Sequence, residues 1–225
     1  MPVDLNADVG EGLSTDAELI QVVTSANVAC GFHAGDDATM RTVCAAALER
    51  GVTVGAHTSY RDREDFGRRE LGVAAATIET ETAEQIRALQ QHGRVAYVKP
   101  HGALYHRASV DAECASAIVA GAAACEVGVM LAFPGSELAR AARAAGLTAV
   151  DEGFADRGYT AEGALVSRGE PGALLDAEAA ARQAVAIADR VESICVHGDS
   201  PDAVSVARAV AAALRSAGVE LRAFA

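Results

Sequence analysis

Residues 52–56 read Val-Thr-Val-Gly-Ala and residues 193–196 read Ser-Ile-Cys-Val, and a histidine follows each run. Both runs are short, rich in β-forming residues, and apolar or small at every position. A strand that is buried on both faces has this continuous pattern, and such strands are typical of parallel sheets covered by helices. The two runs therefore predict a parallel α/β architecture with a polar residue where each strand ends.

Runs of the same kind recur along the chain and alternate with longer stretches that have helical spacing. Strict alternation implies parallel strands joined by crossover helices. Seven units in 225 residues give about 32 residues each, close to the roughly 31 of an eight-unit barrel. We therefore predict one α/β domain, residues 1–225, folded as a seven-stranded parallel (β/α)7 barrel. An open doubly wound sheet fits the periodicity almost as well. The predicted strands are 2–6, 25–30, 52–56, 95–99, 127–132, 147–151 and 193–196. The predicted helices are 15–23, 36–50, 78–92, 111–125, 136–145, 176–190 and 202–217.

The charge balance limits the classes of partner. The chain has 19 basic and 31 acidic residues, a formal net charge of −12, which argues against nucleic acid and against an anionic membrane surface. No stretch reaches the roughly 18 apolar residues of a membrane span, and the first residues do not resemble a signal peptide, so we expect a cytoplasmic protein. The five cysteines include no Cys-x-x-Cys pair, which argues against a disulfide framework and a zinc knuckle.

Ionisable residues gather at the predicted strand ends. Because the carboxyl ends of parallel strands meet at one edge, where active sites of such folds lie, we expect these side chains to share one pocket. Histidines and carboxylates there can hold a divalent metal or act as acids and bases, and their spacing does not decide between the two. The residues are His33, His57, His101 and His197, with Asn6, Asp8 and Glu11 near the first strand and Asp151 and Glu152 at the end of the sixth.

Lys99 is the only lysine among 19 basic residues. A lysine offers a compact charge for an anionic group, or a tunable pKa, and arginine replaces neither. We expect the side chain at the pocket mouth, where it contributes little to the core. No phosphate-binding Gly-rich loop and no Gly-x-Ser-x-Gly elbow occurs. Residues 58–76 and 152–175 are long connections of the kind that is usually functional or lid-like. The charged segment 61–69 is either a solvated loop or an anion-binding lid.

Six motifs, in order, carry a resemblance to a known family. They are Asp4-Leu-Asn-Ala-Asp-Val-Gly-Glu11, Ser25-Ala-Asn-Val-Ala-Cys-Gly-Phe-His-Ala-Gly-Asp36, Gly55-Ala-His-Thr-Ser-Tyr60, Val98-Lys-Pro-His-Gly-Ala-Leu-Tyr105, Phe154-Ala-Asp-Arg-Gly-Tyr159 and Cys195-Val-His-Gly-Asp199. Over essentially its whole length the chain resembles the LamB/YcsF family. The resemblance implies a barrel of the glycoside hydrolase/deacetylase type. It also implies an ATP-dependent 5-oxoprolinase activity, in which 5-oxo-L-proline, ATP and water give L-glutamate, ADP and phosphate, with subunits B and C as partners.

The resemblance also implies roles for particular residues. As catalytic residues it implies Asp8, Glu11, His33, His57, Lys99, His101 and His197, and as substrate- or phosphate-binding residues Asn6, Asn27, Asp36, Asp156 and Arg157. ATP is the implied co-substrate. A divalent metal is left open, with Asp8, His33, His57 and His101 as candidate ligands. Two other hypotheses remain: a metal-dependent hydrolase of the deacetylase type that acts alone, and a non-catalytic subunit that presents substrate to its partners.

Overall fold

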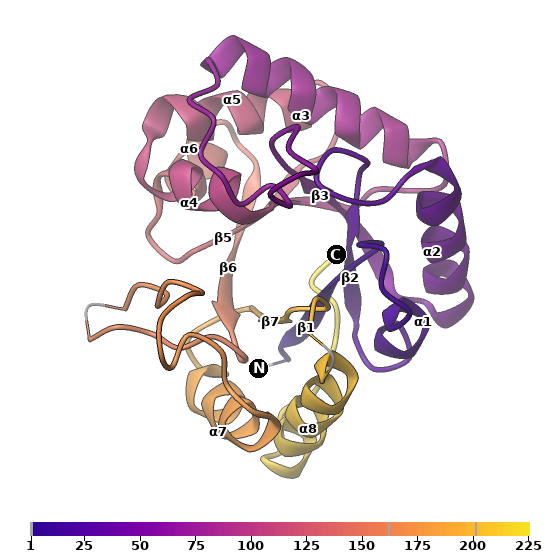
Figure 1. Ribbon diagram of the computed structural model, residues 1–225, viewed down its shortest axis with the longest axis vertical. Coiled ribbons are helices and arrows are strands. Elements are labelled where there is room, and N and C mark those ends of the chain that lie inside the picture. Colours follow the sequence, from indigo (N-terminus) through magenta and orange to yellow (C-terminus); the bar gives the residue numbers. More distant parts are fainter. Residues whose placement is uncertain (1, 162, 201) are drawn as a thin grey trace.

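Seven parallel strands close into a barrel in chain order, as the computed structural model shows for residues 2–161, 163–200 and 202–225 (Figure 1). The barrel closes where β7 pairs with β1, with Asp4 opposite Ser193 and Asn6 opposite Cys195. The predicted seven-stranded barrel is confirmed, and the open-sheet alternative is wrong. The strands are β1 (Asp4–Val9), β2 (Ser25–Ala29), β3 (Thr53–Thr58), β4 (Tyr97–Pro100), β5 (Val129–Ala132), β6 (Thr148–Phe154) and β7 (Ser193–Val196).

Helices surround the barrel on the outside, as Figure 1 shows. None of those in the described part of the chain is long and apolar enough to cross a bilayer. Asp36, Asp111, Ser136 and Asp176 cap four of them through side-chain oxygens, as their positions predict. The helices are α1 (Asp16–Leu19), α2 (Asp37–Arg50), α3 (Ala75–Gln90), α4 (Gly102–Val110), α5 (Ala112–Ala123), α6 (Glu137–Ala144), α7 (Ala177–Ile187) and α8 (Ala203–Ser216).

Helix α4 and strands β1 and β6 differ from the prediction in ways that bear on the site, and β1 runs on to Val9 rather than ending at residue 6. Helix α4 occupies a stretch for which the sequence predicted no element, and it begins directly after the histidine that follows β4. Strand β6 runs on to Phe154, so Asp151 and Glu152 lie inside the strand rather than at its end. Asp151 faces outward and pairs with Arg143 at 3.1 Å, whereas Glu152 is fully buried inside the barrel. The expectation that both carboxylates reach the mouth is therefore wrong.

The inside of the barrel is polar, and the apolar core lies between the sheet and the helices. Along β1 the outward residues Leu5, Ala7 and Val9 belong to that core. The inward residues Asp4, Asn6 and Asp8 bond to side chains of other strands. Barrel interiors are usually filled by branched apolar residues, so a hydrogen-bonded interior marks the inside as a functional part of this molecule. The polar interior includes Asn6, Asp8, Asn27, His57, Lys99, Glu152, Ser193 and Cys195.

Tyr97 fills the barrel below this polar layer. Its hydroxyl donates to the side-chain oxygen of Asn27 at 2.7 Å. The ring lies against Gly55 of the neighbouring strand, where an added Cβ would come within 2.2 Å of ring carbons. Phe224 packs against the same ring, with centroids 5.1 Å apart. Within the described residues, Tyr97 and Phe224 therefore fill the end of the barrel opposite the mouth, and the cavity opens at the mouth.

Candidate active site

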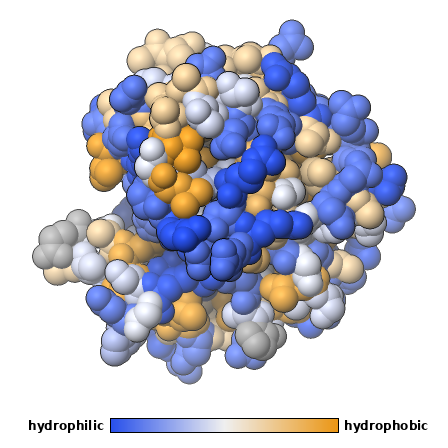
Figure 2. All heavy atoms as spheres, turned by 45° about the horizontal axis from the view of Figure 1, so that its top comes forward, coloured by the Kyte–Doolittle hydropathy of each residue, from blue (hydrophilic) through white to orange (hydrophobic). Residues whose placement is uncertain are grey.

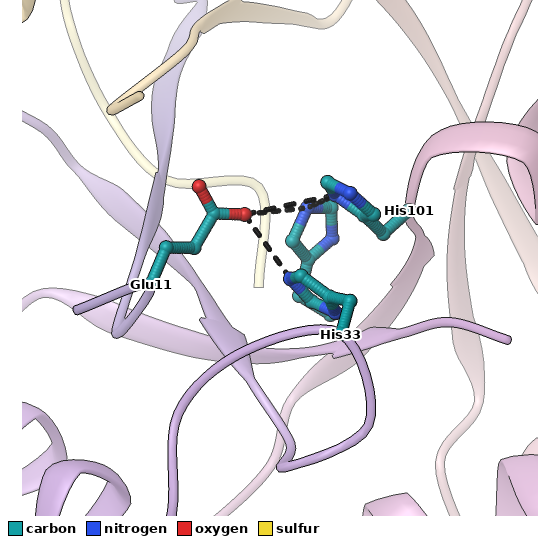
Figure 3. Close-up of side chains that lie close together, drawn as sticks. Glu11, His33 and His101 are labelled. Atoms are coloured by element: carbon teal, nitrogen blue, oxygen red, sulfur yellow. Dashed lines mark hydrogen bonds and ion pairs between the residues drawn. The ribbon is translucent and has the colours of Figure 1, made fainter. Parts of the chain in front are cut away.

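Three histidines and one glutamate form a buried cluster at the carboxyl ends of β1 to β4. The rings of His33 and His101 stack with centroids 3.9 Å apart, and His57 stands edge-on to both. Glu11 Oε1 lies 3.1 Å from His33 Nε2, 3.6 Å from His101 Nδ1 and 4.0 Å from His57 Nε2. In Figure 3 one oxygen of Glu11 faces His33 and His101 from the opposite side of the cluster. We call Glu11, His33, His57 and His101 the histidine cluster.

In each of these rings, the nitrogen that does not face Glu11 has a hydrogen-bond partner of its own. His57 Nδ1 donates to the carbonyl oxygen of Lys99 at 3.0 Å, and His101 Nε2 donates to that of Phe66 at 2.8 Å. His33 Nδ1 lies 2.9 Å from Ser59 Oγ. Burial lowers the pKa of both His33 and His101 well below the usual value, so these two rings are neutral at neutral pH.

A second buried group surrounds the ammonium of Lys99. Its Nζ lies 2.9 Å from Asp8 Oδ1, 3.1 Å from Glu152 Oε1 and 2.9 Å from Cys195 Sγ. Burial alone would lower the pKa of Lys99, but the charges around it, that of Asp8 foremost, raise it well above its ordinary value. Burial would likewise raise the pKa of Asp8, and His57 and then Lys99 overcome this and hold it well below. The pair is therefore ionised, and the ammonium is engaged by side chains inside the barrel.

Glu11 has the opposite electrostatic environment from Asp8. Burial and the neighbouring charge of Asp8 raise the pKa of Glu11 well above the ordinary carboxyl value. A carboxyl group with a raised pKa holds its proton more readily than an ordinary one, whereas an ionised neighbour stabilises positive charge. Two carboxyl groups with divergent pKa values at one site are typical of catalytic machinery.

His197 forms the wall of the site together with Asp156. The Asp156 carboxylate accepts from the backbone N–H of His197 at 2.8 Å and lies 3.0 Å from its Nδ1. Burial would raise the pKa of Asp156, but His197 lowers it. Potential ligand atoms of His197, Asp8 and Cys195 lie within 4.8 Å of one another. Asp156 therefore orients an imidazole next to the Asp8 carboxylate.

A cavity of about 360 Å³ opens from these groups to the mouth, a size that suits a small molecule. Its walls combine ionisable groups with the aromatic rings of Tyr105 and Phe154. The charged and imidazole groups that line it are Asp8, His57, Arg68, Lys99, His101, His106, Arg157, Arg168 and His197. Figure 2 shows that the most hydrophilic residues gather across the middle of the visible face, which agrees with a polar entrance.

Two arginines from different long loops meet one carboxylate beside the cavity. Arg68, from the connection after β3, and Arg168, from the connection after β6, both pair with Asp199. The guanidinium of Arg157 donates hydrogen bonds to two backbone carbonyl oxygens of its own loop, those of Ala173 at 3.0 Å and Val166 at 2.7 Å. The mouth thus holds guanidinium groups that an anionic ligand could reach by displacing Asp199.

Other residues named from the sequence lie away from the cavity. Asn6 and Asn27 are fully buried and bond to each other at 2.6 Å, below the residues that line it. Asp36 accepts from the backbone N–H of Thr39 at 2.8 Å as the cap of α2. Asp8, expected among the metal candidates, lies 3.4 Å from His57 Nε2, and Glu11 completes the histidine cluster instead. Residues of the site that sequence reasoning did not assign to it are Ser59, Phe66, Arg68, Arg168, Cys195 and Asp199.

Ionisable groups that converge at the C-terminal mouth of a closed parallel β/α barrel are typical of β/α-barrel enzymes. The LamB/YcsF family model matches residues 3–225, and the chain belongs to that family. It is 48% identical over 249 residues to the A subunit of 5-oxoprolinase from Nocardia farcinica, with 100% of both chains covered. To the protein of that name from Streptomyces coelicolor it is 49% identical, with 99% of this chain and 100% of the relative covered.

Solved structures agree with the fold. The lactam utilization protein from Thermus thermophilus is 38% identical and superposes with a TM-score of 0.92, with 100% of both chains covered. A family 4 carbohydrate esterase from Streptomyces lividans superposes with a TM-score of 0.53 at 12% identity, with 100% of this chain and 93% of that chain covered. The second likeness concerns the fold alone, and it agrees with the expected deacetylase type of barrel.

Proposed function

We propose that this chain is the A subunit of an ATP-dependent 5-oxoprolinase and that its cavity binds the lactam during ring opening. The observation that carries the proposal is the full-length similarity, at 48%, to a protein named as the A subunit of 5-oxoprolinase. The cavity supports it, because a small, deep site with arginines at its mouth suits a small anionic substrate. ATP as co-substrate and subunits B and C as partners belong to the same proposal.

The chemistry explains why the reaction consumes ATP. The lactam oxygen takes the γ-phosphoryl group, and ADP leaves. One water then bonds to the activated carbon, the C–N bond breaks, and the nitrogen takes a proton, which gives γ-glutamyl phosphate. A second water releases phosphate and leaves L-glutamate. The ring-opening step needs a proton acceptor, a proton donor and stabilisation of developing charge.

The groups of the cavity can supply these functions. His197, oriented by Asp156, is the proton-transfer group that we assign to ring opening. The ionised carboxylate of Asp8, which also lines the cavity, is assigned to stabilising the positive charge that develops on the ring nitrogen. Arg168 and Arg68 are assigned to the substrate carboxylate or the phosphoryl group, in place of Lys99, because the Lys99 ammonium is already bonded inside the barrel.

Reconstitution tests the proposal. The purified chain alone should show little or no ATP-coupled ring opening, and mixing it with subunits B and C should produce ADP and glutamate in equal amounts. In the complex, His197→Gln should lower turnover, whereas Arg190→Ala should not, because the Arg190 side chain is 77% exposed.

Other outcomes contradict specific parts of the proposal. Full activity of the chain alone would exclude a need for partners. Release of acetate from an acetylated amide by the chain alone, without 5-oxoproline turnover, would favour the deacetylase hypothesis. Unchanged turnover of the assembled His197→Gln complex would favour a subunit that only presents substrate.

A further inference from the structure

The protons of two cluster histidines are assigned by their partners. A backbone carbonyl oxygen only accepts, so the hydrogen on His57 is at Nδ1, bonded to Lys99 O, and that on His101 is at Nε2, bonded to Phe66 O. In the neutral rings the lone pairs are then on His57 Nε2 and His101 Nδ1. These two atoms face each other at 3.0 Å. Two lone pairs at that distance repel each other unless a positive charge lies between or beside them.

The third histidine follows the same pattern through a hydroxyl. Ser59 Oγ donates its hydrogen to the carbonyl oxygen of Tyr60 at 3.0 Å, so it accepts from His33 Nδ1. The lone pair of His33 is therefore on Nε2, which faces Glu11 Oε1 at 3.1 Å. Gln85 holds Ser59 in place, because its side chain bonds to both the backbone N–H and the carbonyl of that residue, at 2.9 Å and 3.0 Å.

Four acceptor atoms thus converge on one buried point. One ligand atom from each of Glu11, His33, His57 and His101 lies within 4.8 Å of the other three, and the contacts that name their atoms are those of Glu11 Oε1, His33 Nε2, His57 Nε2 and His101 Nδ1. A proton on Glu11 satisfies only its pair with His33, and a proton on His57 Nε2 satisfies only the contacts of that atom with His101 and Asp8. A single cation at the centre satisfies all four atoms.

The spacing of the four atoms suits a tetrahedral ion. Ligands at the usual zinc–nitrogen distance form a tetrahedron with edges of about 3.3 Å. Four of the six separations within the cluster are 3.0, 3.1, 3.6 and 4.0 Å, and all six are within 4.8 Å. Metal-bound histidines nearly always donate their other ring N–H to a carbonyl or carboxylate. Two cluster histidines do this, and the third donates to a hydroxyl that is itself fixed.

We propose that Glu11, His33, His57 and His101 bind one divalent transition-metal ion with tetrahedral preference, of the zinc and cobalt class. Three imidazoles and one carboxylate favour such ions over magnesium or calcium, which take oxygen ligands. The four ligands come from four consecutive β/α units, so the ion ties together the first half of the mouth. His57 and His101 also line the cavity, and the ion therefore fixes the wall on which substrate would rest.

Metal titration tests this proposal on the full chain after treatment with a chelator. Zn²⁺ should bind with about one equivalent per chain, and Co²⁺ should give the intense visible absorption of a tetrahedral complex. The midpoint of thermal unfolding should rise by roughly 5–10 °C when free Zn²⁺ is 100 times its Kd. Weak binding without a tetrahedral cobalt spectrum would overturn the proposal.

Variants separate the cluster from the other histidines. Ser59→Ala removes only the hydroxyl that orients His33 and should weaken Zn²⁺ binding about 10–100-fold, and His33→Ala should abolish tight binding. The controls are His92→Ala, at a helix end where the ring pairs with Asp37, and His197→Gln inside the cavity. Neither control should change Zn²⁺ affinity. Equal affinity in wild type and Ser59→Ala would refute the assignment even if His33→Ala does not fold.

The outcome does not depend on the proposed 5-oxoprolinase activity, because metal binding is read directly. Tight tetrahedral binding by a complex that never turns over 5-oxoproline would contradict the proposed function alone. Full 5-oxoproline turnover by a chain that binds no metal tightly would overturn the metal proposal alone.

Discussion

Replacing Lys99 with alanine should destabilise the folded chain by about 3–5 kcal/mol, because it leaves buried carboxylates without their cation. The side chain is 2% exposed, and its ammonium lies within 3.3 Å of acceptors from Asp8, Glu152, Cys195 and Asn6. The sequence placed this residue at the pocket mouth, where truncation would cost little stability. The structure corrects that expectation, since Lys99 lies inside the barrel.

Lys99→Arg keeps the charge but should not restore the wild-type properties. Acceptors on several sides at 2.9–3.3 Å enclose a compact ammonium, and a planar guanidinium must push them apart. Overpacking of this kind costs about 1–3 kcal/mol. A shift of about 1 Å in Asp8 can lower the rate roughly 100-fold. We therefore expect the arginine variant to fold with reduced stability and to have turnover nearly as low as the alanine variant.

Urea unfolding and turnover of the reconstituted complex measure the two effects separately. In a thermal unfolding experiment on a chain of this size, a loss of about 3–5 kcal/mol corresponds to a decrease in the melting temperature of roughly 6–20 °C. Arg190→Ala is the matched control, because it removes a cation whose side chain is 77% exposed, and its stability should change by about 0.5 kcal/mol or less. The reasoning is refuted if Lys99→Ala unfolds within about 1 kcal/mol of wild type, or if Lys99→Arg retains most of the turnover.

Three further predictions concern other parts of the molecule. Burial raises the pKa of Asp4 to about 6 from 3.8, so wild-type stability should fall by about 3 kcal/mol as pH rises from about 3 to about 7. Urea unfolding across this range should show a smaller decrease for Asp4→Asn, and parallel curves for the two proteins would contradict the prediction. Gly55→Ala places a Cβ within 2.2 Å of the Tyr97 ring, so the free energy of unfolding should decrease by about 1–3 kcal/mol or more. Thermal unfolding measures this, and an unchanged midpoint would show that the ring moves freely. Arg168→Gln removes a guanidinium that pairs with Asp199 and that we assign to an anionic group of the ligand. The KM for 5-oxoproline should therefore rise with little change in folding, and an unchanged KM would exclude Arg168 from substrate binding.

Much of the fold could be predicted because outward-facing strand positions are mostly apolar, as Leu5, Ala7 and Val9 are in β1, and because four of the described helices begin at a side-chain cap. The same reasoning ended strand β1 and strand β6 too early, since their inward positions are polar. Asp8 and Glu152 interrupt the apolar pattern although they remain in the sheet. Helix α4 was missed because its stability comes from tertiary contacts, such as the buried side chains of Leu104 and Tyr105, rather than from a side-chain cap.

The histidines of the site could be predicted from their places after strands, because all parallel strands end at the same edge. Their partners could not. Phe66 contributes a carbonyl oxygen, which every residue possesses, and Asp199 meets Arg68 across 131 positions of the chain. The sequence carries no local signal for such long-range pairs. Glu152 illustrates the same limit, since only the register of β6 places it against Lys99 rather than in solvent.

The polar interior of the barrel also bears on how this protein can change by mutation. Asp8 and Glu152 share Lys99 as their cation, so the loss of Lys99 penalises both of the carboxyl groups that remain. Effects of substitutions here will be strongly non-additive, and a variant that lacks both a cation and its partner carboxylate can be fitter than either single change. Residues in this polar interior should therefore be replaced together during evolution, whereas exposed positions on the outer helices can be substituted one at a time.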